Sequence, residues 1–294
     1  MTDFDSLKPD PSMIGDVADA PFAILPEPEA MFRKRAARLR AGGDNNALTP
    51  YIHFLAALCD VQADCVAATP LADGPSQNSA RPLKGERCAP GDDFDRVARD
   101  FFKRAAEIPM PEPSKAALAN LDGLPLAPLV RALAEDEDAA HGMAEHIFVA
   151  AALQVYLTRL SARLDVTKLE PDEPGVCPSC GAHAASSFVA GWRGAQGLRF
   201  CSCAMCSTLW RYVRVRCVAC GTTKGISYRE IDGAGGAAKA ECCAECGAYT
   251  KIIYQNIAPD AEPAADDILS LGLDVLVSEE GWRRAGFNPF LIGY

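Results

Sequence analysis

Several features that define common protein classes are missing from this sequence. Its longest apolar run, residues 147–153, is far shorter than the roughly 20 residues that span a bilayer. The first residues, Met1-Thr-Asp-Phe-Asp5, lack the charged and then apolar pattern of a secretory signal. Phosphate-binding glycine loops and a Ser/His/Asp order are also absent. We therefore expect a protein that does not enter a membrane and is not an enzyme.

Positive charge is scarce as well. The 294 residues include 29 Lys and Arg against 39 Asp and Glu, so the formal net charge is −10. Proteins that bind nucleic acid through its phosphates usually carry a basic surface, and an acidic balance argues against that class. The sequence therefore predicts no nucleic-acid partner.

Cysteine, by contrast, is abundant and clustered. Ten of the 13 cysteines lie within residues 177–246, and eight of these form four C-x-x-C pairs. Moving the first two pairs forward by 40 residues superimposes them on the last two, so the region is an internal repeat. The pairs are Cys177/Cys180, Cys203/Cys206, Cys217/Cys220 and Cys243/Cys246.

The spacing of these pairs is typical of metal sites. One C-x-x-C turn directs two thiolates at a point, and a second turn completes a tetrahedral four-sulfur site for zinc or a single iron. The spacing leaves the choice between these metals open. Four sulfurs leave no position for water or substrate, which again argues against catalysis. Thiols that must stay reduced to bind metal also indicate a cytoplasmic location.

Some residues of the cysteine region depart from the repeat. Three of the four pairs are followed by glycine, whose positive φ lets backbone N–H groups turn towards sulfur. Ser207 follows the remaining pair. Cys201 and Cys242 lie just before two of the pairs and are either substitute ligands or spare thiols. We favour spare thiols, because their use as ligands would break the 40-residue match.

The remaining segments predict an α+β protein in which helices surround the cysteine region. Apolar stripes at helical spacing indicate helices at 29–40, 114–121, 127–134 and 138–164, with others starting near Thr49 and Phe94. Short β-like runs are expected at 187–190, 198–200, 209–215, 225–231 and 249–254. The predicted division starts with a flexible lead-in at 1–28 and a helical domain at 29–170, which includes a loop or disordered segment at 69–92. Two metal modules follow at 171–215 and 216–255. A C-terminal helix at 256–294 is expected to pack back on the helical domain.

Two basic segments allow two interpretations each. Arg33, Lys34, Arg35, Arg38 and Arg40 crowd one predicted helix. They indicate either a site for phosphate or an acidic partner, or simply a solvated helix face. The arginines of the run 209–215 would either contact a partner or offset the negative thiolate centres.

The order of several motifs carries a family resemblance. They are Arg35-Ala-Ala-Arg-Leu-Arg40, Leu48-Thr-Pro-Tyr-Ile-His-Phe54, Cys177-Pro-Ser-Cys-Gly181, Cys203-Ala-Met-Cys-Ser-Thr-Leu-Trp210, Arg214-Val-Arg-Cys-Val-Ala-Cys-Gly221, and a tail with Leu273-Asp274 and Asn288-Pro-Phe-Leu291. Over most of the chain, this pattern resembles the formate dehydrogenase accessory proteins, the FdhE family.

The resemblance implies both a fold and a function. It implies a helical domain with two rubredoxin-like modules that bind iron through the eight paired cysteines. It also implies a cytoplasmic, non-catalytic maturation or proofreading factor, a chaperone that contacts the catalytic subunit of a molybdenum- or tungsten-dependent respiratory formate dehydrogenase. A rubredoxin-like electron-transfer protein acting on the dehydrogenase is the main alternative, ahead of a zinc-ribbon nucleic-acid binder. The oligomeric state is left open between a monomer and a homodimer.

Overall fold

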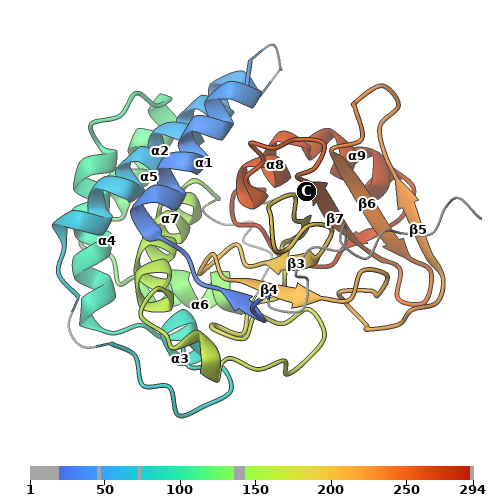
Figure 1. Cartoon of the computed structure of the whole chain (residues 1–294). Coiled ribbons are helices and arrows are strands. Elements are labelled where there is room, and N and C mark those ends of the chain that lie inside the picture. The colour runs from blue at the N-terminus through green and yellow to red at the C-terminus, as the bar shows by residue number, and fades with distance from the viewer. Residues whose placement is uncertain (1–19, 45–47, 72–73, 136–142, 292–294) are drawn as a thin grey trace, which may run out of the picture.

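Most helices gather in one half of the molecule and the sheet lies in the other, which confirms the predicted α+β class (Figure 1). The computed structural model describes residues 20–44, 48–71, 74–135 and 143–291. In this part of the chain, α1–α7 form the helical half. The sheet and the two C-terminal helices form the other half.

The helical half is organised around α7 (Met143–Ser161). Residues 148–161 of this helix are all buried, and most of them are apolar, although Gln154, Thr158, Arg159 and Ser161 are buried with them. Residues 138–142 of the predicted helix lie outside the described residues. The helices that pack against α7 are α1 (Pro28–Gly42), α2 (Thr49–Ala68), α3 (Lys84–Cys88), α4 (Asp92–Ala105), α5 (Glu112–Asn120) and α6 (Ala127–Glu135).

One described helix, α2, is long and apolar enough to cross a membrane by length and composition. More than half of that stretch, 56%, is buried inside the protein. It packs against α1, α4 and α7. The buried fraction and the packing of α2 are those of a helix in a protein core.

The sheet displays the internal repeat directly. Its strand order is β1-β4-β3-β2-β7-β6-β5, and β8 pairs with β7 off this path. Adding 40 to the numbers of β2 reproduces β5, and the same shift places β3 on β6 and β4 on β7. The strands are β1 (Ala23–Ile24), β2 (Ser186–Val189), β3 (Arg199–Ser202), β4 (Leu209–Tyr212), β5 (Ile226–Arg229), β6 (Ala238–Cys243), β7 (Ala248–Tyr254) and β8 (Arg283–Arg284).

The two repeats join through one parallel pair. Within each repeat the three strands are antiparallel neighbours, whereas β2 and β7 run parallel in the register Ser186↔Lys251 to Val189↔Tyr254. The first strand of one repeat therefore lies beside the last strand of the other. One continuous sheet results.

Several segments differ from the sequence-based expectations, among them strand β6, which was not expected at all. The expected loop 69–92 contains α3, and the expected lead-in 1–28 contains β1, which pairs with β4. The strand expected at 209–215 ends at Tyr212, because its neighbour β3 begins at Arg199, opposite that residue. The expected C-terminal helix is two helices, α8 (Pro263–Leu269) and α9 (Leu271–Glu279), which meet at Ser270.

The C-terminal helices return to the rest of the protein as predicted. Helix α8 packs on α1, and α9 packs on β6. The α1–α8 contact includes a buried ion pair of 3.1 Å between Arg35 and Glu262, beside a pair of 2.6 Å between Arg38 and Asp266. Much of the basic charge of α1 therefore pairs within the chain. Arg35 and Arg38 therefore form neither a site for phosphate or an acidic partner nor a solvated helix face, the two interpretations proposed from the sequence.

Candidate metal centres

The structure brings the eight paired cysteines together in two groups of four. Within each group, the four sulfur atoms all lie within 4.8 Å of one another. In the first group, Sγ of Cys177 lies 3.5 Å from Sγ of Cys206, and Sγ of Cys180 lies 3.5 Å from Sγ of Cys203. The matching distances in the second group are 3.7 Å for Cys217–Cys246 and 3.8 Å for Cys220–Cys243.

These distances fit a tetrahedral ion. Sulfurs that each lie about 2.3 Å from one tetrahedral metal are about 3.8 Å apart. A disulfide requires about 2.05 Å, and all 13 cysteines, which lie in the described residues, are free. The donor set and its spacing therefore suit a tetrathiolate metal centre in each group. Ligation by these eight cysteines stays a prediction.

The turn after each pair has the backbone shape that such centres need. The residue that follows the second cysteine has positive φ in all four turns, between 58° and 75°. Three of these residues are glycines, and the fourth is Ser207 with φ 58°. Ser207 is the one non-glycine residue with positive φ in the described part of the chain. The repeat therefore preserves the left-handed turn even where glycine is missing.

The first group lies inside the main apolar core. All four cysteines are buried, and the helical half donates three hydrogen bonds to the backbone of its turns. The Leu83 amide donates to the Ser179 carbonyl at 2.8 Å, beside the start of α3. The other two bonds run from Arg87 Nε to the Cys180 carbonyl at 3.0 Å and from Gln154 Nε2 to the Ala204 carbonyl at 2.7 Å.

The second group lies at the surface. Cys220 is exposed and Cys246 is half-buried, whereas Cys217 and Cys243 are buried. The Thr222 amide hydrogen bonds to Cys220 and lowers the pKa of this thiol. At the equivalent buried position, hydrogen bonding with Cys177 and the other thiols raises the pKa of Cys180. The two groups therefore differ in environment although they share one spacing.

Four of the five cysteines outside the two groups have thiols whose pKa is raised by burial. Burial raises the pKa of Cys201 to about 12 and that of Cys242 to about 11. Burial likewise raises the pKa of Cys59 and of Cys65 to about 12. Thiols with such values stay protonated at neutral pH, so these four residues pack as small apolar groups.

A buried ion pair that the sequence analysis missed links the two modules. Arg199 on β3 meets Glu241 on β6 at 2.9 Å, and their side chains are 0% and 2% exposed. Arg199 Nη1 also donates to the carbonyls of Arg214 and Arg216, just beyond β4. The same side chain thus holds the segment that leads from the first module to the second. Its signal in the sequence is the one charged residue of the buried four-residue strand Arg199–Ser202.

A second buried network attaches β7 to the C-terminal helices. Lys251 on β7 lies 3.0 Å from Asp267 and also pairs with Asp274, and all three side chains are at most 1% exposed. Arg284 pairs with both aspartates, at 2.6 Å and 2.5 Å. Asn288 donates to Asp267 at 2.7 Å. Although burial opposes it, the charges of Arg284 and Lys251 lower the pKa of Asp267 to about 2.

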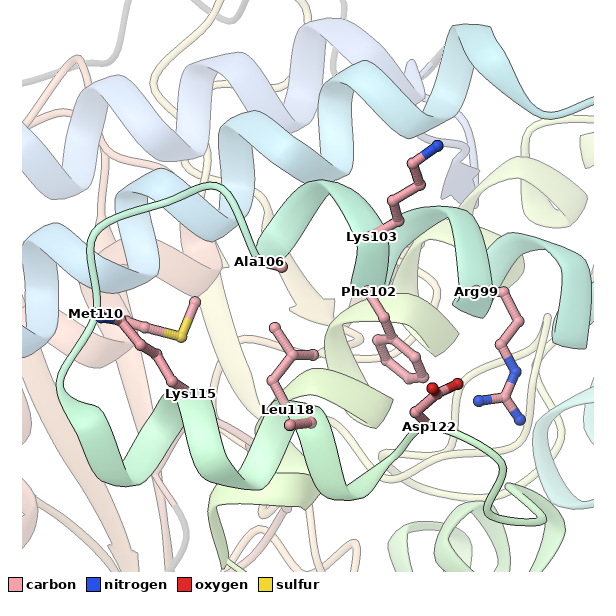
Figure 2. A pocket seen from close by; sticks show the side chains of 9 residues that line it. Arg99, Phe102, Lys103, Ala106, Met110, Lys115, Leu118 and Asp122 are labelled. Carbon is pink, nitrogen blue, oxygen red and sulfur yellow. The ribbon is translucent and has the colours of Figure 1, made fainter.

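A cavity of about 450 Å³ lies between α4 and α5, in the helical half. Figure 2 shows Phe102 and Leu118 projecting into it from the two helices, with Lys103 and Lys115 at its border. None of the eight paired cysteines lines this cavity. The cavity and the metal centres are therefore separate features.

Comparisons with known proteins agree with this architecture. Family models described as "FdhE, N-terminal", "FdhE, central domain" and "FdhE, C-terminal domain" match residues 20–173, 176–214 and 215–291. A protein of Rhizobium meliloti named "Protein FdhE homolog" is 38% identical, over 98% of both chains. The chain belongs to the FdhE family. A homolog from Cronobacter sakazakii is 33% identical, over 92% of this chain and 91% of the relative.

A solved structure has the same fold. The crystal structure of the FdhE protein from Pseudomonas aeruginosa superimposes with a TM-score of 0.85 at 24% identity. The match covers 93% of this chain and 99% of that chain. The arrangement of the helical half and the sheet is therefore the FdhE fold.

Proposed function

We propose that this FdhE-family protein is a non-catalytic accessory factor for formate dehydrogenase. The observation that supports this role is the match of three FdhE family models, in order, over residues 20–291. In detail, we propose that it binds the catalytic subunit of a molybdenum- or tungsten-dependent respiratory formate dehydrogenase. It would do so in the cytoplasm, where it would assist maturation or check the subunit before export.

A pull-down tests the proposed partner. The tagged full-length chain is incubated with the purified catalytic subunit, and retention is measured over a range of salt concentrations. We expect specific retention with a defined stoichiometry. An unrelated molybdenum enzyme of similar charge serves as the control. Equal retention of both enzymes, or of neither, would contradict the proposal.

We also propose that each four-cysteine group holds one iron, with zinc as the alternative. Iron, when bound, supplies one-electron chemistry, and the protein side chains supply the cage and its solvent access. Metal analysis of anaerobically purified protein should give two ions per chain. Iron would give a coloured, reducible protein, and zinc a colourless one. Folded, reduced protein without metal would overturn the proposal of two metal centres.

One observation favours a second function, electron transfer to or from the dehydrogenase. Cys220 is exposed, so an electron would have a short path between a partner and the second group. Stopped-flow mixing of reduced protein with the oxidised dehydrogenase would reveal such transfer as bleaching or recovery of colour. A colourless zinc protein would exclude this function.

A further inference from the structure

The repeat places the same turn surface in two different environments. In the first module, three carbonyl groups of the turns accept hydrogen bonds from the helical half. They belong to Ser179, Cys180 and Ala204, and the donors are one backbone amide, one guanidinium and one carboxamide. Buried carbonyls require such partners, because an unsatisfied one costs roughly 1–3 kcal/mol.

The second module repeats these groups without the partners. Forty residues further on, the equivalent positions are Ala219, Cys220 and Ala244, and all three residues are exposed. In the described part of the chain, no donor reaches their carbonyl groups. The acceptors that anchor the first module to a helical surface are therefore open to solvent in the second.

Neighbouring residues extend this surface. Thr223, Lys224 and Glu245 are exposed, and the Ala244 amide donates to Gly225 at 2.9 Å, which holds the two turns together. We call residues 219–220, 223–225 and 244–245 the second turn face. The side chains of Ala219 and Ala244 beside Cys220 are small, and Lys224 and Glu245 contribute one charge of each sign.

We propose that the second turn face is the docking surface for a helical surface of a partner protein. That partner surface would present arginine or glutamine side chains to the three open carbonyls, as Arg87 and Gln154 do in the first module. The chemistry is complementary, because carbonyls only accept and a thiolate centre is negative, so donor groups and cations are favoured. The inference rests on the proposed function, under which the partner is the dehydrogenase catalytic subunit.

A second copy of this chain is a poorer occupant. The helical surface with the required donors is already used, because Leu83, Arg87 and Gln154 contact the first module of their own chain. A second copy could present them only by separating its own first module. A heterologous partner has no such cost.

Ala244→Glu and Ala219→Glu test the proposal in the full-length, metal-loaded chain. Each change adds bulk and negative charge on the face without altering a cysteine, so the affinity for the purified catalytic subunit should fall tenfold or more. Ala234→Glu is the matched control, because Ala234 is an exposed residue of the same module outside the face. Calorimetry gives the affinities, and metal analysis checks that each variant keeps its two ions.

Hydrogen exchange on the unaltered complex gives a second measurement that needs no variant. Amides of residues 219–225 and 244–246 should become protected when the partner binds. Normal binding by both face variants, or protection confined to other segments, would overturn the docking surface and leave the proposed function intact. No binding by the unaltered chain would overturn both. A homodimer broken by Ala244→Glu would show that a second copy occupies the face instead.

Discussion

The two cysteine modules have the same ligand spacing and the same three-strand pattern, but the protein surrounds them differently. The first contributes its four cysteines to the core of the helical half, which hydrogen bonds to its turns. The second lies further along the sheet and exposes Cys220. A repeated sequence can therefore give one copy that is part of a core and one that is free to face a partner.

The second module is attached through the β2–β7 strand pair, through an apolar cluster with α9 and through buried ion pairs. Arg199 and Glu241 link it to the first module, and Lys251 pairs with two aspartates of the C-terminal helices. Buried charges of this kind specify geometry strongly, because removing one partner leaves the other uncompensated. The two modules should therefore fail in different ways, which the following substitutions examine.

The largest contrast is expected between Cys180→Ser and Cys220→Ser. Each removes one sulfur, and a structural tetrathiolate metal contributes about 10 kcal/mol or more of apparent binding free energy. Because the first group is part of the main core, Cys180→Ser should destabilise the helical half as well, with loss of helical circular dichroism. Cys220→Ser should unfold only its own module. Equal loss of helical signal in both variants would contradict the contrast.

A matched pair of surface changes should differ by several kcal/mol. Ala204 is 5% exposed beneath Gln154, whereas the equivalent Ala244 is exposed. Ala204→Glu buries an unpaired charge and should lower the free energy of unfolding by about 3–5 kcal/mol. Ala244→Glu should change it by less than about 0.5 kcal/mol. Urea unfolding measures both values, and similar losses would show that the second turn face is covered within the chain.

Asp267→Asn should reveal the ionic attachment of the second module. The pKa of Asp267 is lowered to about 2, so its charge stabilises the fold above the unfolded-state pKa near 3.9. At neutral pH the variant should be less stable by about 3 kcal/mol. The difference from the unaltered chain should shrink as pH falls from about 4 towards 2.

Urea unfolding between pH 2 and 7 measures that difference. The control is Glu280→Gln, which removes a half-exposed partner of Arg229 and should leave stability almost unchanged, because solvent screens this pair. A pH-independent difference for Asp267→Asn would mean that its charge is not responsible.

The smallest contrast concerns the residue that follows the second C-x-x-C pair of each module and has positive φ, which is Ser207 in the first module and Gly247 in the second. A non-glycine residue in this conformation costs about 1–2 kcal/mol. Ser207→Gly should therefore stabilise the first module by up to about 1 kcal/mol. The gain is reduced by the loss of the hydrogen bond of 3.4 Å that Arg35 donates to the Ser207 hydroxyl. Gly247→Ser should destabilise the second module by about 1 kcal/mol, because φ there is 68°. Thermal unfolding measures both shifts, and a loss of stability in Ser207→Gly would show that the hydroxyl contact dominates.

Sequence patterns predicted the parts of the fold that depend on local spacing. The apolar stripe Phe32, Ala36 and Leu39 is buried in α1, and the 40-residue repeat recurs in the strands. The predicted extension of the strand 209–215 was wrong, since alternation cannot show where the neighbouring strand begins. Helix α3 was missed because it is only five residues long and gains its order from contacts such as Arg87 with Cys180.

The C-x-x-C spacing places two thiols together in each turn, and the 40-residue repeat predicts that the four turns form two groups of four cysteines. Which group is buried cannot be inferred from this spacing, since the contacts of Leu83, Arg87 and Gln154 come from segments far away in the chain. The same holds for Lys251 with Asp267 and Asp274, whose pairing requires β7 to meet α8 and α9. Burial and charge pairing depend on distant neighbours, and a repeat that looks symmetrical in sequence therefore acquires two unlike surroundings.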